Sequence, residues 1–216
     1  RIKGLVLKYP ESTRKAMAKA EYRSEIDFLI SNKVRNEFIK NLTLSRKGNT
    51  LLLYQMVEKH GQVLYDIINS SVDDRKVFFV HGKVSADERE SVREITERES
   101  NAIIVASYGT FSTGINIRNL HNIIFASPSK SRIRNLQSIG RGLRRGDNKD
   151  KATLYDIADD LTYKSWNNYT LKHFAVRIKM YNEEEFEYKI YNIRINDESM
   201  SNQTSERRDN NLFNRQ

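Results

Sequence analysis

The residues best suited to chemistry lie in a strongly basic stretch between positions 129 and 151. Its charged members are Lys130, Arg132, Arg134, Arg141, Arg144, Arg145, Lys149 and Lys151, opposed only by Asp147 and Asp150. Arg141 and Arg144 are three positions apart, so on a helix both would project from the same sector. Two guanidinium groups in this arrangement can clamp a γ-phosphate and stabilise the charge that develops during its transfer. The pattern predicts a phosphate site, with a solvated basic helix as the alternative.

Residues at fixed offsets around this pair favour the phosphate interpretation. Gly140 precedes Arg141 directly and would let a phosphate approach the backbone, while Gln137 lies four positions before Arg141. Arg132 and Arg134 come just before the motif and are candidates for contacts with a nucleic-acid backbone. The arrangement places a nucleotide contact and a nucleic-acid contact in adjacent parts of one segment.

A second candidate segment, residues 107–116, is rich in hydroxyl side chains and contains two glycines. It follows a short apolar run, and ligands of open parallel sheets collect where strands end. Hydroxyls and exposed amides can hold phosphate oxygens, either of a nucleotide or of a nucleic-acid backbone. An ordinary Gly/Ser/Thr turn is an equally good interpretation.

A third segment, His81–Ser85, superficially resembles a phosphate loop. A Walker A loop requires Gly-x-x-x-x-Gly-Lys-Ser/Thr, but Val77 stands where the first glycine belongs and Val84 where Ser or Thr belongs. These departures exclude a P-loop. The acidic run at 87–90 follows the capping-box pattern Ser85-Ala-Asp-Glu88, so helix capping explains it better than catalysis does.

Composition narrows the class of partner. The chain of 216 residues has a net charge of +9, which favours a polyanion. It has no cysteine, and its four histidines form no helical i, i+4 pair, so we expect no metal site. No apolar run approaches the roughly 20 residues needed to cross a bilayer, so we expect a cytoplasmic protein without membrane contact. Because the first residue is Arg rather than Met, we expect a fragment or a processed product.

The candidate segments need a framework, and the apolar pattern predicts one. Short apolar runs alternate with helical stretches, with strands expected at 51–54, 77–80, 102–106, 122–126 and 152–157. Wholly apolar strands between amphipathic helices indicate a parallel sheet covered on both faces. We therefore predict a doubly wound α/β fold, followed by a helix at 169–180 and a strand at 186–195.

The ends of the chain differ from this pattern. Residues 2–7 read as a short strand, and 12–42 read as helical because apolar residues recur at three- and four-residue steps. We therefore predict a helical lead-in from a preceding lobe at 1–44 and the α/β lobe at 45–195. Residues 196–216 carry almost no apolar side chains, which predicts a polar, disordered tail.

The order of these segments resembles the second RecA-like lobe of superfamily 2 helicases. Motif IV of that family is similar to Asn49–Gln55, its His-Gly segment to His81-Gly82, and its motif V to Ser107–Asn116. Motif VI, Gln-x-x-Gly-Arg-x-x-Arg, matches Gln137, Gly140, Arg141 and Arg144. The resemblance covers residues 45–195, and four motifs in the family's order make it specific.

The resemblance implies a role for each matching residue. Arg141 and Arg144 would meet the γ-phosphate, and Gln137 would help to place the attacking water or the neighbouring motif. The nucleotide cleft would be lined by Gly114, Asn116 and Gly140. The nucleic-acid contacts would be made by Thr110, Ser112, Thr113, His81, Gly82, Lys83, Arg132 and Arg134. Many relatives carry Asp where this sequence has Asn116, so this position offers no charged contact to a ribose or a cation.

The elements that hold ATP and Mg²⁺ in this family do not occur in the sequence. Neither a Walker A lysine nor an Asp-Glu box is present in the 216 residues, and both belong to the first lobe of such motors. The resemblance therefore implies an ATP-dependent helicase in which a first RecA-like lobe holds ATP and Mg²⁺. We predict that this chain alone hydrolyses ATP negligibly.

The resemblance also implies the substrate: DNA that is branched or forms single-strand/duplex junctions, in recombination and repair, with RNA–DNA hybrids as a further substrate. Two other functions remain open. The chain could be a non-catalytic nucleic-acid-binding module, or the lobe of an RNA helicase or of the translocating subunit of a nuclease. The aromatic residues Tyr163, Trp166 and Tyr169 could stack on bases, although packing of a helix is the favoured interpretation.

Overall fold

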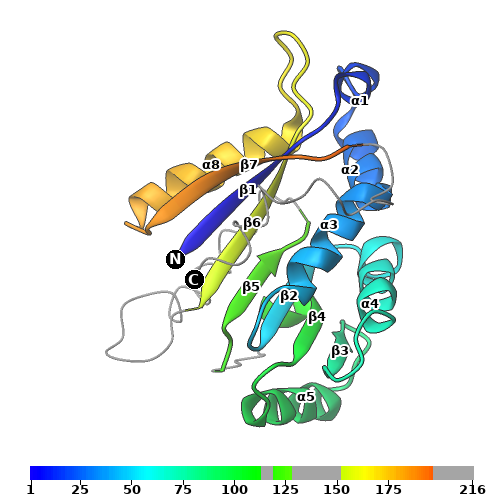
Figure 1. The fold of residues 1–216 in the computed structure, drawn as a ribbon, viewed down its shortest axis with the longest axis vertical. Coiled ribbons are helices and arrows are strands. Elements are labelled where there is room, and N and C mark those ends of the chain that lie inside the picture. Colours follow the sequence, from blue (N-terminus) through cyan, green and yellow to red (C-terminus); the bar gives the residue numbers. More distant parts are fainter. Residues whose placement is uncertain (113–118, 128–151, 197–216) are drawn as a thin grey trace, which may run out of the picture.

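The computed structural model describes residues 1–112, 119–127 and 152–196. They form a seven-stranded sheet in the order β3-β4-β2-β5-β6-β1-β7, in which every neighbouring pair is parallel (Figure 1). The strands are β1 (Ile2–Lys8), β2 (Thr50–Tyr54), β3 (Val77–Val80), β4 (Ile103–Ser107), β5 (Asn122–Phe125), β6 (Thr153–Asp160) and β7 (Tyr188–Arg194). The predicted parallel sheet is confirmed.

Helices cover both faces of this sheet. They are α1 (Glu11–Ala16), α2 (Tyr22–Ser31), α3 (Lys33–Leu44), the π-helix η1 (Val57–Gly61), α4 (Gln62–Asn69), α5 (Ala86–Arg98), α6 (Tyr108–Ser112) and α8 (Tyr169–Glu183). Side chains of α2, α3 and α4 share one apolar cluster with the sheet, and side chains of α5 and α8 share a second. The two clusters take alternate residues of the strands, which confirms the doubly wound α/β architecture.

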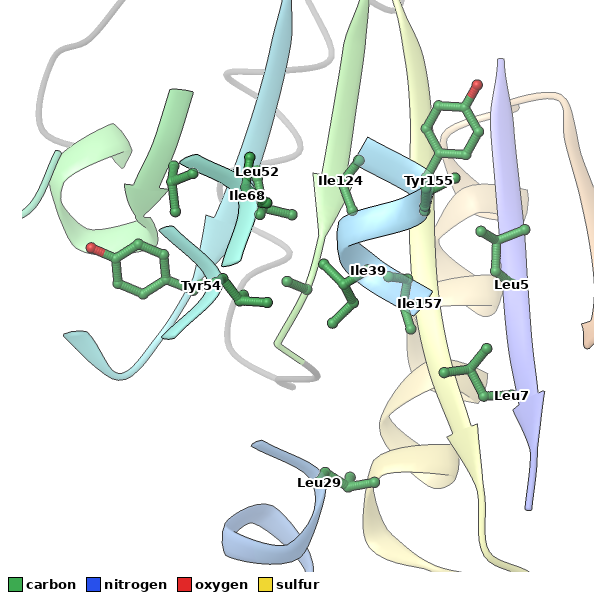
Figure 2. Close-up of a cluster of buried hydrophobic side chains, with 14 of the residues drawn as sticks. Leu5, Leu7, Leu29, Ile39, Leu52, Tyr54, Ile68, Ile124, Tyr155 and Ile157 are labelled. Atoms are coloured by element: carbon green, nitrogen blue, oxygen red, sulfur yellow. The ribbon is translucent and has the colours of Figure 1, made fainter. Parts of the chain in front are cut away.

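The central strand β2 shows why the apolar runs lack alternation. Leu52 and Tyr54 belong to the cluster under α2, α3 and α4, whereas Leu51 and Leu53 belong to the cluster under α5 and α8. All four side chains are fully buried, because both faces of the strand are covered. Figure 2 shows Ile39 of α3 packed over the sheet in the first of these clusters.

The stretch predicted as one helical region is three helices. The side chain of Asn32 accepts a hydrogen bond from the backbone N–H of Arg35 (2.9 Å) and so caps α3 at its start. A side chain that bonds the backbone locally competes with continuation of the preceding helix, so α2 ends at Ser31. Between α1 and α2, Lys19 adopts a left-handed conformation (φ 62°) that an α-helix cannot contain.

Residues 1–44 add more than helices to the lobe. Strand β1 lies between β6 and β7, so the first residues of the chain are inside the sheet. The division of the chain at residue 45 stays a prediction, and the tail at 197–216 lies outside the described residues. In the ranges that the structure describes, no helix is both long and apolar enough to span a bilayer.

Candidate nucleotide and nucleic-acid interface

The carboxyl ends of the parallel strands meet at one edge of the sheet, where α/β proteins bind ligands. His81 follows β3 directly, Ser107 ends β4, and Ser127 lies just beyond β5. Lys8 and Asp160 end β1 and β6. In Figure 1 this edge is the one from which α1 leaves β1, opposite the N-terminus. The predicted segments at 81–85 and 107–112 therefore lie along the same edge.

The segment after β3 forms an exposed turn. The His81 ring lies 5.0 Å from the ring of Phe79, and the backbone N–H of Lys83 donates to His81 Nδ1 (3.3 Å). A Cβ added to Gly82 would meet nothing within 4 Å, so the turn is open to solvent. The Lys83 ammonium lies 3.9 Å from the carboxylate of Glu58, and both side chains are more than 80% exposed. Such a pair contributes little, so the ammonium can bind another anion.

The acidic residues after this turn serve as a helix cap. Ser85 Oγ accepts from the backbone N–H of Glu88 (3.2 Å), and the Glu88 carboxylate accepts from the backbone N–H of Ser85 (3.0 Å). The hydrogen bonds that this carboxylate accepts from the backbone N–H and the hydroxyl of Ser85 lower the pKa of Glu88. The predicted capping box at the start of α5 is confirmed.

The segment after β4 turns its first hydroxyls inward. Ser107 Oγ and Thr110 Oγ1 are 2.7 Å apart, and Thr110 is only 4% exposed. The hydroxyl of Tyr108 donates to the carbonyl oxygen of Ser127 (3.2 Å), which ties the start of α6 to the end of β5. Gly109 is exposed between them. The sequence did not predict this inward orientation of Thr110.

All of the residues predicted to contact the nucleotide, and three of those predicted to contact nucleic acid, lie outside the described ranges. These residues are Thr113, Gly114, Asn116, Arg132, Arg134, Gln137, Gly140, Arg141 and Arg144. Ser112 ends α6. Residues 128–151, which carry the basic motif, connect β5 to β6, two neighbouring parallel strands, and begin at the carboxyl edge. The roles of these residues stay predictions.

A buried ion pair that the sequence did not reveal lies next to the point where this connection begins. Arg35 of α3 donates to both carboxylate oxygens of Asp159 (2.8 and 3.0 Å) and to the carbonyl oxygen of Ala126 (2.8 Å). The Tyr9 hydroxyl donates to the same carboxylate (2.8 Å). Burial alone would lower the pKa of Arg35, but Asp159 raises it, so the guanidinium stays charged. The pair joins α3, β6 and the end of β5.

A buried neutral network continues from this ion pair. His60 Nδ1 lies 3.0 Å from Ser127 Oγ, and His60 Nε2 lies 3.2 Å from Asn36 Oδ1. Ser127 Oγ accepts from the backbone N–H of Gln55 (3.1 Å), so its own hydrogen can go to His60. Burial and the nearby Arg35 lower the pKa of His60 to about 3. The imidazole is therefore neutral and fixes the position of Ser127.

A second buried ion pair lies on the other face of the sheet. Arg177 of α8 donates to both oxygens of Asp156 (2.8 and 2.9 Å), and the Tyr181 hydroxyl donates to the same carboxylate (2.7 Å). Asp156 lies in the middle of β6, away from the carboxyl edge. One feature of the sequence could have indicated both pairs. Aspartates at 156 and 159 occur in or next to a stretch predicted to form a buried strand, and a buried carboxylate needs a partner.

The remaining predictions for this region concern aromatic and metal-binding residues. Trp166 packs against the main apolar cluster, and the Tyr169 ring lies edge-on to Tyr22 at 5.8 Å. This arrangement agrees with packing rather than base stacking for Trp166. Across the described residues, no three His, Asp or Glu side chains gather in a way that could hold a metal ion.

Comparison with known proteins places the chain among helicases. The family model described as "Helicase conserved C-terminal domain" matches residues 33–146. The ATP-dependent DNA helicase uvsW of Enterobacteria phage T4 is 34% identical over 208 residues, which cover 90% of this chain and 41% of that protein. The crystal structure of T4 UvsW matches with a TM-score of 0.77 over the same shares of the two chains.

More distant structures share the fold alone. The C-terminal domain of the DEAD-box protein Dbp5 has a TM-score of 0.55 at 14% identity, over 88% of this chain and 90% of that one. Domain 2 of the DEAD-box helicase Mss116p, bound to an RNA duplex, has a TM-score of 0.52 at 15% identity, over 87% and 63% of the two chains. The sheet is thus that of a RecA-like lobe. Because the family match spans more than half of the 216 residues, the chain belongs to the helicase C-terminal domain family, as the second lobe of a superfamily 2 helicase.

Proposed function

We propose that this chain is the second motor lobe of an ATP-dependent DNA helicase or translocase that acts on branched DNA in recombination and repair. The observation that carries the proposal is the 34% identity with T4 UvsW across 90% of the chain. The chain spans 41% of the length of that relative. We assign the Walker elements to a first lobe, because they do not occur in the 216 residues. RNA–DNA hybrids are a further substrate in this proposal.

On the nucleotide side, the lobe contributes the arginines of the basic motif. Arg141 and Arg144 stabilise the γ-phosphate from across the cleft between two lobes, and Gln137 places the attacking water or the neighbouring motif. Gly114, Asn116 and Gly140 line the nucleotide cleft. The described residues do not gather carboxylates that fit Mg²⁺, so the proposal assigns that ion to the first lobe.

On the nucleic-acid side, the lobe grips the phosphate backbone. The exposed turn formed by His81, Gly82 and Lys83 offers backbone amides and an ammonium to phosphate oxygens. Arg132 and Arg134 act from the connection between β5 and β6. Closure around ATP shortens the distance between the grips of two lobes, and hydrolysis reopens it, so the strand advances stepwise.

The hydroxyl residues after β4 also contact the nucleic-acid backbone in this proposal, but Thr110 does so only after a rearrangement. The Thr110 hydroxyl is hydrogen-bonded to that of Ser107, and Thr110 is 4% exposed. Contact between Thr110 and the nucleic-acid backbone therefore requires this hydrogen bond to break. Ser112 and Thr113 follow it at the end of α6 and beyond. Such a rearrangement would couple the grip on the nucleic acid to the state of the nucleotide site.

The test of this function is ATP hydrolysis with and without a first lobe. The chain alone should hydrolyse ATP negligibly, and adding a first lobe with Walker A and B elements, covalently or in trans, should restore DNA-stimulated turnover. In the completed motor, Arg144→Ala should lower turnover by about 10³- to 10⁵-fold with DNA affinity largely kept. Robust hydrolysis by the chain alone would contradict the proposal.

The same variant separates the motor from a non-catalytic binding module. The net charge of +9 favours nucleic-acid binding in either case, so binding alone does not decide between them. A binding module would lose affinity in Arg144→Ala and would show no turnover to lose. Stimulation by branched DNA, duplex DNA, RNA and an RNA–DNA hybrid, measured side by side, then distinguishes a DNA motor from an RNA helicase.

A further inference from the structure

A groove of about 720 Å³ opens at the carboxyl edge where β6, β1 and β7 end. This is the opposite end of the sheet from β3 and the turn that follows it. The groove is lined by Lys8, Asp160 and Arg194, the last residues of these three strands, and by Glu11 and Arg14 of α1. None of the family motifs identified in the sequence includes these five residues.

The register of the strands brings the terminal residues together. Lys8 pairs with Asp160 on one side and with Arg194 on the other. Neighbouring strands lie about 4.8 Å apart, and paired residues of parallel strands project to the same face. Asn192 lies two residues before Arg194 on the same strand, so its amide faces the groove from the same side.

Arg14 is held in place by the fold. Its Nε donates to the carbonyl oxygen of Tyr9 (3.1 Å), and its Nη1 donates to the carbonyl oxygen of Thr162 (2.9 Å). These two bonds fix the guanidinium at the wall of the groove. Its Nη2 has no hydrogen-bond partner in the part of the chain that the structure describes, so a donor remains for a ligand.

The charge of the groove suits an anion with a single charge. Lys8 and Asp160 form an ion pair and offset each other. Hydrogen bonds from Lys8 and Thr162 lower the pKa of Asp160 even though its partial burial acts in the opposite direction, so the carboxylate stays ionised. Of the remaining charges in the lining, two are positive, those of Arg14 and Arg194, and one is negative, that of Glu11, which leaves a net charge of +1.

Arg194 is the group best placed to bind such an anion. Its side chain is exposed and makes neither a hydrogen bond nor an ion pair with the residues that the structure describes. A guanidinium offers five donors in a fork that matches phosphate oxygens. A phosphodiester carries one negative charge, whereas a nucleoside triphosphate carries several and would leave the groove with an excess of negative charge.

A nucleic acid that lay along the carboxyl edge from the turn after β3 would extend toward the groove. Six inter-strand steps separate β3 from β7, a span of about 29 Å. Duplex DNA rises by about 3.4 Å per base pair, so roughly eight base pairs cover this span. A backbone bound at the turn after β3 can therefore reach the groove within one turn of the double helix.

We propose that this groove binds a phosphodiester group of nucleic acid through Arg194 and Arg14, as a second backbone grip at the far end of the carboxyl edge. The inference rests on the proposed function, because it extends the path of the same bound nucleic acid. Glu11 reduces the net positive charge of the groove, so the groove favours a singly charged backbone phosphate over free nucleotides, which carry more negative charge.

The test is the salt dependence of DNA binding by the 216-residue chain, measured by fluorescence anisotropy with a labelled mixed-sequence duplex. Each phosphate contact contributes about 0.9 to the slope of log affinity against log salt. Arg194→Ala should lower the slope by about this amount and weaken binding roughly three- to fivefold at low salt. Glu11→Gln should strengthen binding, because it removes the opposing charge.

A matched control lies on the same strand. Lys189 is exposed near the start of β7, at the opposite edge of the sheet, so Lys189→Ala removes the same charge without touching the groove. It should leave the slope unchanged. Thermal unfolding of Arg194→Ala should match that of the unmodified chain, since the Arg194 side chain makes neither a hydrogen bond nor an ion pair with the residues that the structure describes.

The outcomes separate this inference from the proposed function. If the folded chain binds no DNA, both fail. If the chain binds DNA and Lys83→Ala lowers the slope, while Arg194→Ala behaves like Lys189→Ala, the groove inference alone is overturned. It is also overturned if Arg194→Ala weakens binding of inorganic phosphate or ADP but leaves the DNA slope unchanged, because the groove would then be a site for small anions.

Discussion

Strand β6 carries one buried aspartate for each face of the sheet, and each pairs with an arginine from a helix on that face. Asp156 bonds Arg177 of α8, and Asp159 bonds Arg35 of α3, with all four side chains almost fully buried. A tyrosine hydroxyl completes each group. The two units are therefore chemically alike, but they lie at different heights along the strand.

The difference lies in what else the arginine reaches. Arg35 also bonds the carbonyl oxygen of Ala126, beside the His60–Ser127 network at the end of β5. Arg177 makes no corresponding bond to another strand among the hydrogen bonds of the described residues. The Arg177–Asp156 pair thus fixes only a helix to the sheet, whereas the Arg35–Asp159 pair also fixes the chain just beyond the end of β5.

The largest effect should come from breaking the pair on the α3 side. Arg35→Met leaves the Asp159 carboxylate buried without its cation, which should lower the free energy of unfolding by about 4–6 kcal/mol, including about 1 kcal/mol for the bond to Ala126. Urea unfolding measures this. If the variant does not fold, Arg35→Met combined with Asp159→Leu should, because the uncompensated charge is gone. A loss below about 1 kcal/mol in Arg35→Met would contradict this view of the pair.

The pair on the α8 side should cost slightly less to break. Arg177→Met leaves Asp156 uncompensated but removes no bond to a neighbouring strand, so we expect a loss of about 3–5 kcal/mol in the same urea experiment. DNA affinity of the folded fraction should stay unchanged, because this pair lies away from the carboxyl edge. A larger loss than that of Arg35→Met would remove the distinction between the two faces.

The buried, neutral His60 should make the free energy of unfolding depend on pH in a range where the two ion pairs do not titrate. An unfolded histidine binds a proton near pH 6.5, whereas the pKa of His60 in the folded chain is about 3. Stability is therefore full above pH 6.5 and falls as the pH drops toward 3. Between pH 7 and 5, the chain should lose about 2 kcal/mol more than His60→Gln does. If the free energy of unfolding falls equally with pH in the unmodified chain and in His60→Gln, His60 is not held in the neutral form by the fold.

The smallest effect on stability should come from the exposed turn. Lys83→Ala removes a side chain that is 85% exposed, so the melting temperature should change by less than about 2 °C. The salt slope for duplex DNA should nevertheless fall by about 0.9, because one phosphate contact is lost. An unchanged slope would remove this turn from the nucleic-acid interface.

Local sequence patterns determined the strands of this protein and the order of its motifs, but not the division of residues 12–42 into three helices. Strand β3 begins at Val77 and ends at Val80 as predicted, and the capping box at Ser85 forms as its spacing required. Both outcomes depend on residues within a few positions of one another. The basic motif at 137–144 is equally local, which is why it could be identified although its placement lies outside the described residues.

Only the tertiary structure decided which distant residues meet. Arg35 and Asp159 are 124 positions apart, and Lys8 and Asp160 are 152 apart, so no local period links them. The groove at Arg194 exists because β1 inserts between β6 and β7, an order that apolar patterning does not encode. A buried charge is stable only beside its partner, and the fold places that partner through strand order and register.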